Sequence, residues 1–398
     1  MPLQVLVIGD IGNIFQTLQK FTKADIHIIN FFKDGAGVYT YEKNVETFSN
    51  YKVRDHLKKI NEIAHNYDIC ITMGTGERIA YLADLNYSVF YVGRDIDAPR
   101  FIKNSKEEWF DEPLHRLNFL ERRFYKKCFE NANFHLAYTW VFEHLKKYTK
   151  NGIKLDMMPI DTSVFKTTLE SLDKPKRKFT FFSPQRMGKP KGTDLIWKAL
   201  PLCKSDFEII QVEWFDVSTK EELRIKDELI KTKPQQVKFI PMISRADISK
   251  YYNFADAVMG NMRIGTYALI ELEGIFCRKP VLQYTDKNMK IFSGNNELDS
   301  PIVPTSNEPA EIAKVIDRIV DDKNFREQLL EKEYTFAKEI SDPQRVADWW
   351  DNFFLKIHQK HPKLKKNTPK INVNFQLILF LLGNRLYFKK FKNLLGIN

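Results

Sequence analysis

The stretch FTFFSPQRMGKPKGTDLIWKAL, residues 179–200, decides the fold class. Its apolar start predicts a strand, and a helix follows near Thr193, a residue type that caps helices. The loop between them brings Arg186, Lys189 and Lys191 together beside glycines, which is unfavourable unless an anion lies among them. A helix N-terminus would add a partial positive charge. The segment therefore predicts a strand–turn–helix unit with an anion-binding turn, and a solvated lysine-rich loop is the alternative.

The same alternation of short apolar runs and helical patterns continues along the whole chain. Amphipathic stretches such as residues 55–67 and 122–132 separate the apolar runs. Strands that alternate with helices indicate parallel sheets covered on both faces. The runs predicted as strands are residues 3–9, 25–31, 67–74, 88–93, 133–138, 154–160, 179–184, 207–215, 237–242, 256–261, 280–284 and 301–305.

A polar, proline-containing segment at residues 161–178 divides this series in two and is predicted as a linker. We therefore expect an α/β protein with two Rossmann-like domains, residues 1–160 and 179–345. A ligand site is expected in the cleft between them, at the carboxyl ends of the strands. Residues 346–361 predict a terminal helix that returns to the N-terminal domain, and residues 362–398 predict a basic amphipathic tail.

Composition and charge indicate a soluble globular protein, with 43% apolar and 28% charged residues. Most of the net charge of +11 comes from residues 352–398, which contain nine lysines, one arginine and no acidic residue. Because the body is nearly neutral, we expect no nucleic-acid partner. The four cysteines are far apart, and the N-terminal apolar run predicts a strand, not a signal peptide. These features predict a cytoplasmic protein.

A second motif, RIGTYALIELEGIFCRKPVLQY, occupies residues 263–284 and predicts a glycine turn, an apolar helix and a returning strand. Glu271 and Glu273 lie about 200° apart around such a helix, so only one of them is expected to face the interior. A carboxylate among the apolar neighbours of Glu273 needs hydrogen bonds, for instance from the hydroxyls of a ribose. A surface glutamate is the alternative.

Taken in order, four segments resemble the family 4 retaining glycosyltransferases, glycosyl transferases group 1, which have the GT-B fold. The resemblance covers roughly residues 90–355. The segments are Arg186 with Lys191-Gly192, Glu273 before Pro280-Val281, MPIDTSVFK at residues 158–166 and YYNFADAVM at residues 251–259.

The resemblance implies a donor site for a nucleotide diphosphate sugar, which would be a co-substrate and not a cofactor. The residues it assigns to the donor are Arg186, Lys191, Gly265, Thr266, Tyr267, Glu273 and Met242. Arg186 and Lys191 match the pair that binds the diphosphate and stabilises it as it leaves. Glu273 matches the glutamate that binds the ribose, residues 265–268 open the helix that faces the phosphates, and Met242 lies in the loop beside the base.

Two positions depart from the family pattern. Gly265 stands where a second glutamate commonly holds the donor sugar, so the resemblance implies altered sugar recognition. Arg94 stands where many relatives have a catalytic histidine, and Asp95 matches the acid that often follows it. Asp95 would face the transferred sugar or the acceptor hydroxyl, and a loop-capping aspartate is the alternative.

Two glycine loops of the first domain, GDIGN at residues 9–13 and GTGER at residues 74–78, are expected on the acceptor or sugar side. Gly12 would allow close approach of an acceptor or of a phosphate, with Gly74 and Thr75 nearby. GDIGN lacks the full dinucleotide-binding pattern, so NAD is not expected. His115 lies in a charged helical segment and is a further candidate for the cleft.

The sequence Asp95-Ile96-Asp97 spells the Asp-x-Asp motif of metal-dependent glycosyltransferases. Those enzymes have a different, single-domain fold, and the basic pair at residues 186 and 191 already supplies the positive charge that a metal would supply. We therefore expect no metal and no cofactor.

The tail at residues 363–396 has an apolar run too short to span a membrane, a basic aromatic half, and upstream lysines at 363, 365, 366 and 370. This pattern predicts an anchor on an anionic membrane surface. A helix packed on the protein or on a partner subunit is the alternative.

These features predict a glycosyltransferase that moves a sugar from a nucleotide diphosphate donor to an acceptor, with retention of anomeric configuration by the resemblance. A lipid-linked or membrane-presented glycan acceptor would suit the tail. A nucleotide-sugar epimerase of the same architecture is one alternative. A non-catalytic nucleotide-sugar-binding protein is another, and Gly265 and Arg94 favour it.

Overall fold

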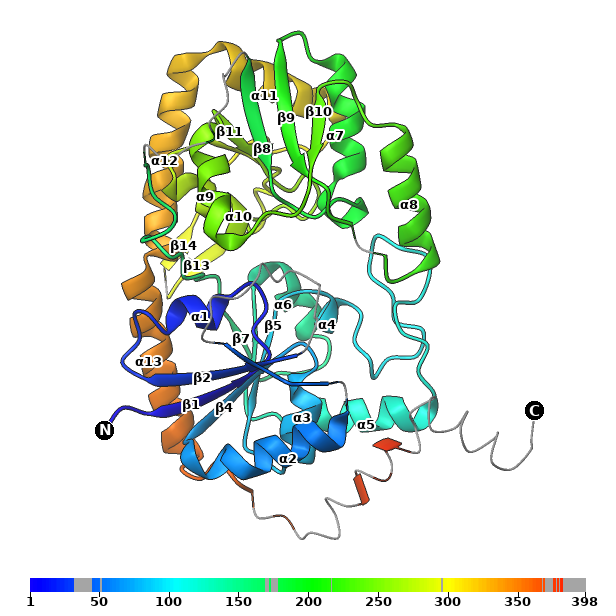
Figure 1. The fold of residues 1–398 in the computed structure, drawn as a ribbon, viewed down its shortest axis with the longest axis vertical. Coiled ribbons are helices and arrows are strands. Elements are labelled where there is room, and N and C mark those ends of the chain that lie inside the picture. Colours follow the sequence, from blue (N-terminus) through cyan, green and yellow to red (C-terminus); the bar gives the residue numbers. More distant parts are fainter. Residues whose placement is uncertain are drawn as a thin grey trace, which may run out of the picture. The chain divides into compact units, whose positions relative to one another are not determined.

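The computed structural model forms two compact units (Figure 1). Among the residues that the structure describes, the first unit contains those up to Lys154 together with those from Ala347 onward, and the second contains those from Leu155 to Val346. The division thus comes earlier than the boundary expected at residue 160. The structure describes residues 1–31, 45–50, 52–168, 172, 178–215, 217–294, 296–366, 368, 375–376, 378 and 380–381.

The first unit is built on a seven-stranded parallel sheet with the strand order β3-β2-β1-β4-β5-β6-β7. Side chains of the central strands β1 and β4 are almost fully buried, as expected for strands covered on both faces. The strands are β1 Gln4–Ile8, β2 Asp25–Asn30, β3 Glu46–Thr47, β4 Ile69–Met73, β5 Ser88–Tyr91, β6 His135–Ala137 and β7 Gly152–Lys154.

Helices cover this sheet, and the last of them comes from the C-terminal part of the chain. Trp350 is fully buried, with its ring 5.0 Å from Phe15 and 5.7 Å from Phe90. The part of α13 from Ala347 onward therefore contributes to the first unit's core. The helices of this unit are α1 Ile14–Leu18, α2 Val53–Ile63, α3 Gly76–Leu82, α4 Arg94–Asp97, α5 Phe119–Glu130, α6 Thr139–Leu145 and most of α13 Pro343–Lys360, with a 3-10 turn at Ala64–Asn66.

The second unit has a five-stranded parallel sheet with the order β10-β9-β8-β11-β12 and a separate antiparallel hairpin. Its strands are β8 Phe179–Ser183, β9 Phe207–Val212, β10 Val237–Ile240, β11 Ala257–Met259, β12 Val281–Leu282, β13 Ile291–Ser293 and β14 Asn296–Leu298. Its helices are α7 Thr193–Ala199, α8 Lys220–Lys231, α9 Arg245–Phe254, α10 Leu269–Phe276, α11 Pro309–Asp321 and α12 Lys323–Ser341, with 3-10 turns at Lys189–Lys191 and Leu200–Leu202. Two parallel α/β units confirm the predicted fold class.

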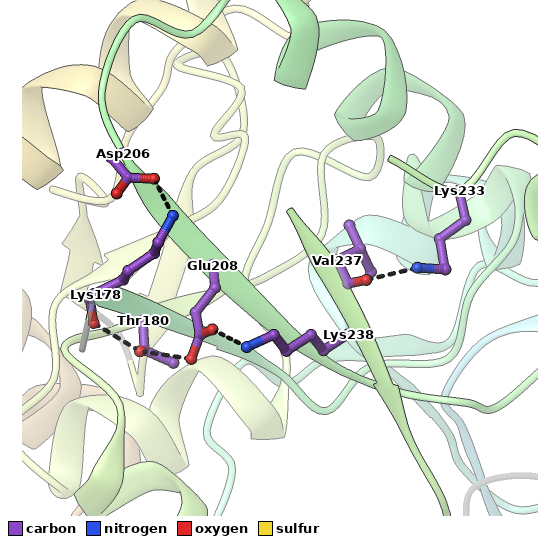
Figure 2. Close-up of polar contacts among 7 residues, drawn as sticks. All are labelled: Lys178, Thr180, Asp206, Glu208, Lys233, Val237 and Lys238. Carbon is purple, nitrogen blue, oxygen red and sulfur yellow. Dashed lines mark hydrogen bonds and ion pairs between the residues drawn. The ribbon is translucent and has the colours of Figure 1, made fainter. Parts of the chain in front are cut away.

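A row of polar side chains crosses strands β8, β9 and β10 (Figure 2). Glu208 accepts hydrogen bonds from Thr180 Oγ1, at 3.4 Å, and from Lys238 Nζ. In the loop before the edge strand β10, Lys233 Nζ donates to the Val237 carbonyl at 2.8 Å. A lysine on an edge strand discourages pairing with another chain, so Lys238 on β10 protects the open edge of the sheet.

Two segments predicted as strands are not strands. Residues 155–160 follow β7 as a buried irregular segment. Their polar groups pair with other residues of the second unit instead of with a neighbouring strand. Tyr267 donates its hydroxyl to the Asp156 carbonyl at 2.5 Å, and Phe292 N–H donates to Asp156 Oδ2 at 2.9 Å. Residues 301–305 make only an isolated bridge, from Val303 to Leu282, since prolines at 301 and 304 remove backbone donors.

The start of the predicted tail docks on the first unit. Lys365 Nζ donates to Asn61 Oδ1 at 2.6 Å, and Lys366 Nζ donates to the Asn131 carbonyl at 3.0 Å. Phe380 is 6% exposed and lies 4.7 Å from the ring of Phe124. These two lysines thus bind the protein and not a membrane surface, which matches the alternative for this part. Lys370 and residues 382–398 lie outside the described residues. No helix in the described part is long and apolar enough to cross a membrane.

Candidate functional site

The loop between β8 and α7 holds Arg186 and Lys191 as predicted from the sequence. Gly192, at φ +70°, ends the loop and caps α7, and a Cβ atom there would lie 2.9 Å from Met262. Helix α7 therefore begins at Thr193, and Thr193 Oγ1 accepts the Gly188 N–H at 3.0 Å. Because the loop packs against residue 262 this closely, only glycine fits at position 192.

The pKa of Lys191 is shifted by its surroundings in this loop. This pKa is lowered to about 8, chiefly by burial; the Glu271 carboxylate opposes this shift and the Arg186 guanidinium contributes to it. The ammonium is still mostly protonated at neutral pH, but it lacks the hydration that favours its charge. An anion bound beside Lys191 would compensate for that loss.

Glu271 is a residue of the candidate site to which the sequence analysis assigned no role. It is fully buried, and its carboxylate accepts the N–H groups of Asn261 at 3.1 Å and Ala268 at 2.9 Å. Burial raises its pKa, and Lys191 opposes that shift. The expectation that only one of the two glutamates of α10 faces the interior is wrong, because Glu271 folds back over the helix N-terminus while Glu273 packs on another side. A glutamate at the third position of a helix was the available signal.

Glu273 is 2% exposed and bound by two partners. Tyr252 donates its hydroxyl to Oε2 at 3.0 Å, and Arg245 donates from Nη1 to Oε1 at 3.3 Å. Burial raises the pKa of Glu273, and Arg245 opposes the shift. The carboxylate is thus fixed in orientation, and a carboxylate has further lone pairs beyond the two used here.

The turn before α10 places the remaining predicted donor residues. Gly265 has φ +80°, and a Cβ atom there would lie 2.9 Å from Asp286 Cβ. Thr266 is buried, and Tyr267 is 3% exposed with its hydroxyl on Asp156, so Tyr267 anchors the turn. Met242, after β10, is 49% exposed.

Two further pairs tie the loops of the second unit together. Arg263 donates from Nη2 to both carboxylate oxygens of Asp194 at 2.7 Å. Gln185 Nε2 donates to the Gly260 carbonyl at 2.8 Å, and its Oε1 is buried without a hydrogen-bond partner. These residues position the loop that carries Arg186 and Lys191.

In the first unit, the loop after β1 is built around Asp10. Its carboxylate accepts the N–H groups of Phe15 at 3.1 Å and Gln16 at 3.0 Å, so the start of α1 already holds an anion. That negative charge disfavours a phosphate at Gly12, which has φ +74°, and favours the acceptor alternative. Asn13 is 1% exposed, and neither polar atom of its side chain has a hydrogen-bond partner.

The loop after β4 carries Gly74, at φ +57°, and Thr75, which precedes α3. A Cβ atom on Gly76 would lie 2.1 Å from the Ile8 carbonyl, so the first turn of α3 packs directly against β1. Glu77 follows in the first turn, and its Oε2 is buried without a hydrogen-bond partner. Burial raises its pKa to about 8, Arg100 opposes the shift, and Asp95 adds to it.

Asp95, in α4 after β5, is the companion of Glu77. Its Oδ1 accepts the Gly93 N–H at 3.0 Å, whereas Oδ2 is buried without a hydrogen-bond partner. Burial raises the pKa of Asp95 to about 6, against the effect of Gly93 N–H and Arg100. Glu77 and Arg100 are thus members of this cluster that the sequence analysis did not name.

Arg94 and His115 complete the surroundings of Asp95. Arg94 forms an ion pair from Nε to the buried carboxylate of Glu107. Burial lowers the pKa of His115 to about 3, and the cations Arg100 and Arg94 contribute. His115 is therefore neutral at physiological pH. The described residues contain no group of three or more His, Cys, Asp or Glu side chains placed to hold a metal ion.

Comparison with known proteins gives a family-model match for part of the chain and a fold for the whole. No curated protein matches this chain. A family model described as "Glycosyl transferases group 1" matches residues 164–336.

Three solved structures are similar to this chain over nearly their whole length. The Anabaena protein HepE in complex with UDP and glucose is 14% identical, with a TM-score of 0.63 over 89% of this chain and 100% of that one. Sucrose-phosphate synthase from Thermosynechococcus elongatus is 13% identical, with a TM-score of 0.65 over 90% and 100%. A glycosyltransferase from Rickettsia africae is 15% identical, with a TM-score of 0.57 over 92% and 100%. The chain therefore has the GT-B fold, and most of its second unit matches the glycosyl transferases group 1.

Proposed function

We propose that the chain is a glycosyltransferase that moves a sugar from a nucleoside diphosphate sugar to an acceptor. The observation that carries the proposal is the loop at residues 186–191 inside the matched domain, where Arg186 and a half-buried Lys191 lie at one turn. Arginine offers a planar fork and lysine a point charge, which together suit a diphosphate.

The chemistry expected of this loop is stabilisation of the leaving diphosphate. Negative charge develops there as the bond between sugar and phosphate breaks, and fixed cations in a poorly hydrated site stabilise it most. The Glu271 carboxylate favours the charged form of Lys191, while two backbone N–H groups fix Glu271 itself. Glu273 is proposed to orient the ribose with the lone pairs that Tyr252 and Arg245 leave free.

The first unit is proposed to hold the acceptor and the transferred sugar. Glu77, Asp95 and Asn13 all have buried polar atoms that lack a hydrogen-bond partner in the protein. Sugar hydroxyls could supply such partners, because each hydroxyl both donates and accepts. Asp95, with a pKa of about 6, is ionised at neutral pH and would accept a hydrogen bond from an acceptor hydroxyl.

The finer features of the reaction rest on resemblance. The family 4 enzymes that this chain resembles retain the anomeric configuration, and we propose the same outcome here. The solved structures of HepE contain UDP or UDP-glucose, which makes uridine the first base to test. We also propose a cytoplasmic reaction without a cofactor or metal; the four free cysteine thiols suit a reducing compartment.

Thermal stabilisation by nucleotides tests the donor site. UDP, ADP, GDP and their glucose conjugates would be added to the wild type, to Lys191→Ala and to Lys198→Ala, whose lysine is exposed on α7. A ligand that binds only the folded protein raises the melting temperature by mass action. We expect one diphosphate to stabilise the wild type and Lys198→Ala but not Lys191→Ala.

The outcomes separate the alternatives. Stabilisation of all three proteins would place the nucleotide elsewhere, and no stabilisation at millimolar ligand would remove the support for a donor site. Slow hydrolysis of a bound nucleotide sugar, lost in Lys191→Ala, would support a transferase. Binding without hydrolysis or transfer would support a non-catalytic nucleotide-binding protein.

A further inference from the structure

The outward face of α5 is strongly basic. Phe124, Tyr125, Cys128 and Phe129 turn into the core of the first unit, and a capping box between Asn118 and Glu121 fixes the start of the helix. The opposite side of the helix carries Phe119, Arg122, Arg123, Lys126, Lys127 and Glu130. The helix is therefore amphipathic, with one apolar face and one polar face, and the polar face is almost entirely cationic.

A hollow of about 540 Å³ lies between this face and residues 101–103. Five cations line it, namely Lys103, Arg122, Arg123, Lys126 and Lys127, against the single carboxylate of Glu130. Glu130 is 3.0 Å from Lys127 and 3.8 Å from Lys126. Lys103 and Arg123 have no carboxylate within 4.0 Å among the described residues, so the hollow has an excess of positive charge.

Exposed apolar side chains border the same hollow. Phe119 is 65% exposed and Ile102 is 39% exposed. In the predicted tail, Phe380 packs on Phe124 of α5, and Phe375 (56%) and Ile378 (52%) are exposed. Figure 1 draws this segment beside α5. Large apolar side chains that face water among cations are costly unless something apolar and anionic covers them.

We propose that the outward face of α5, together with residues 101–103, docks on an anionic phospholipid surface. The cations would contact lipid phosphates, and Phe119 and Ile102 would enter the boundary between headgroups and acyl chains. A nucleic acid or a soluble phosphate would satisfy the cations but leave Phe119 in water. This surface differs from the residues of the predicted tail and does not depend on the proposed function.

Vesicle binding by the full chain tests the proposal. Vesicles of phosphatidylcholine alone and of phosphatidylcholine mixed with phosphatidylglycerol would be sedimented with the wild type, Arg123→Ala/Lys126→Ala and Phe119→Ser. A matched control, Lys220→Ala/Lys231→Ala, removes two exposed lysines from α8. Each basic side chain near an anionic surface contributes about five-fold to binding, so we expect a loss of roughly 25-fold for the α5 double variant and little for the control.

A second readout detects insertion directly. In Phe119→Trp, the new indole is expected to shift its emission to the blue with anionic vesicles and not with neutral ones. Unchanged melting temperatures, and unchanged stabilisation by UDP if UDP binds, show that the variants are folded.

Three results would overturn the proposal. Equal binding of anionic vesicles by the α5 variants and the wild type would assign any membrane contact to another part of the chain. Competition by inorganic phosphate at constant ionic strength would indicate a site for a soluble anion. Tighter binding to duplex DNA than to anionic vesicles, unaffected by Phe119→Ser, would indicate a nucleic-acid surface.

Discussion

The ends of the two sheets differ in how their charges are satisfied. In the second unit, both carboxylate oxygens of Glu271 and of Glu273 accept hydrogen bonds. In the first unit, Glu77 and Asp95 each keep a buried oxygen without a hydrogen-bond partner. A site whose polar groups already have hydrogen-bond partners is preorganised for a ligand of fixed geometry. Buried polar groups without partners can instead bind the polar groups of a ligand. The contrast is consistent with a diphosphate in the one and sugar hydroxyls in the other.

The largest expected effect comes from Glu271→Ala. Two backbone N–H groups would lose their partner, and the half-buried Lys191 would lose the carboxylate that favours its charge, so we expect the unfolding free energy to fall by about 3–5 kcal/mol. Urea unfolding monitored by circular dichroism measures this. Glu327→Ala, an exposed residue of α12, is the control and should change stability by about 0.5 kcal/mol or less. Equal stability of the two variants would contradict the buried network.

Glu77 should make the first unit less stable as pH rises. Its pKa is about 8 in the folded chain against 4.5 unfolded, so the unfolded state releases this proton first. Stability is therefore lost between pH 4.5 and pH 8, by roughly 1–4 kcal/mol. Melting temperatures at pH 5, 6.5 and 8 for the wild type and Glu77→Gln measure this. Glu77→Gln should be less sensitive to pH, and a parallel response of the two proteins would show that Glu77 is already ionised when folded.

Restoring the family's glutamate in Gly265→Glu should damage the second unit. At φ +80°, with Asp286 close by, a side chain at residue 265 is strained and should cost about 1–3 kcal/mol. Thermal unfolding with and without UDP-glucose checks this. Gly294→Ala, also at positive φ but with nothing within 4 Å of its Cβ, separates backbone strain from crowding. A more stable Gly265→Glu that binds UDP-glucose more tightly would show that the turn relaxes.

The smallest effect is on the pH dependence of binding. Because the pKa of Lys191 is about 8 in the free protein, affinity for UDP should fall above pH 8, by up to about ten-fold per pH unit. Lys191→Arg stays charged and should bind with little change between pH 7 and pH 9. Calorimetric titration of both proteins at pH 7, 8 and 9 measures this. The same fall in both would assign the titration to another group.

The sequence predicted much of the fold because buried parallel strands are continuous apolar runs. Its failures have physical causes. Residues 155–160 are apolar for the same reason as a strand, namely burial, but their polar groups pair with side chains and distant backbone. Residues 301–305 have strand composition but lack the backbone donors that a ladder needs.

At the candidate site, the sequence placed Arg186 and Lys191 on one loop, because strand, glycine and helix patterns fix where a loop lies. The sequence did not predict the role of Glu271. Helical periodicity indicates which face of a helix a residue lies on, but it does not predict a side chain that folds back to accept a hydrogen bond at the helix N-terminus. The sequence also missed Glu77, whose perturbed pKa depends on burial and on Asp95 and Arg100, residues distant in sequence.

The route of the chain also sets an order for folding during synthesis. Residues 155–346 are continuous, so the second unit can fold as soon as it leaves the ribosome. The first unit begins earlier but lacks Trp350 and Phe354, which are fully buried in its core, until α13 has been made. Part of the apolar surface of the first unit's early strands therefore stays exposed while the second unit is translated. The half of the molecule that is synthesised first is expected to be the last to reach its native state.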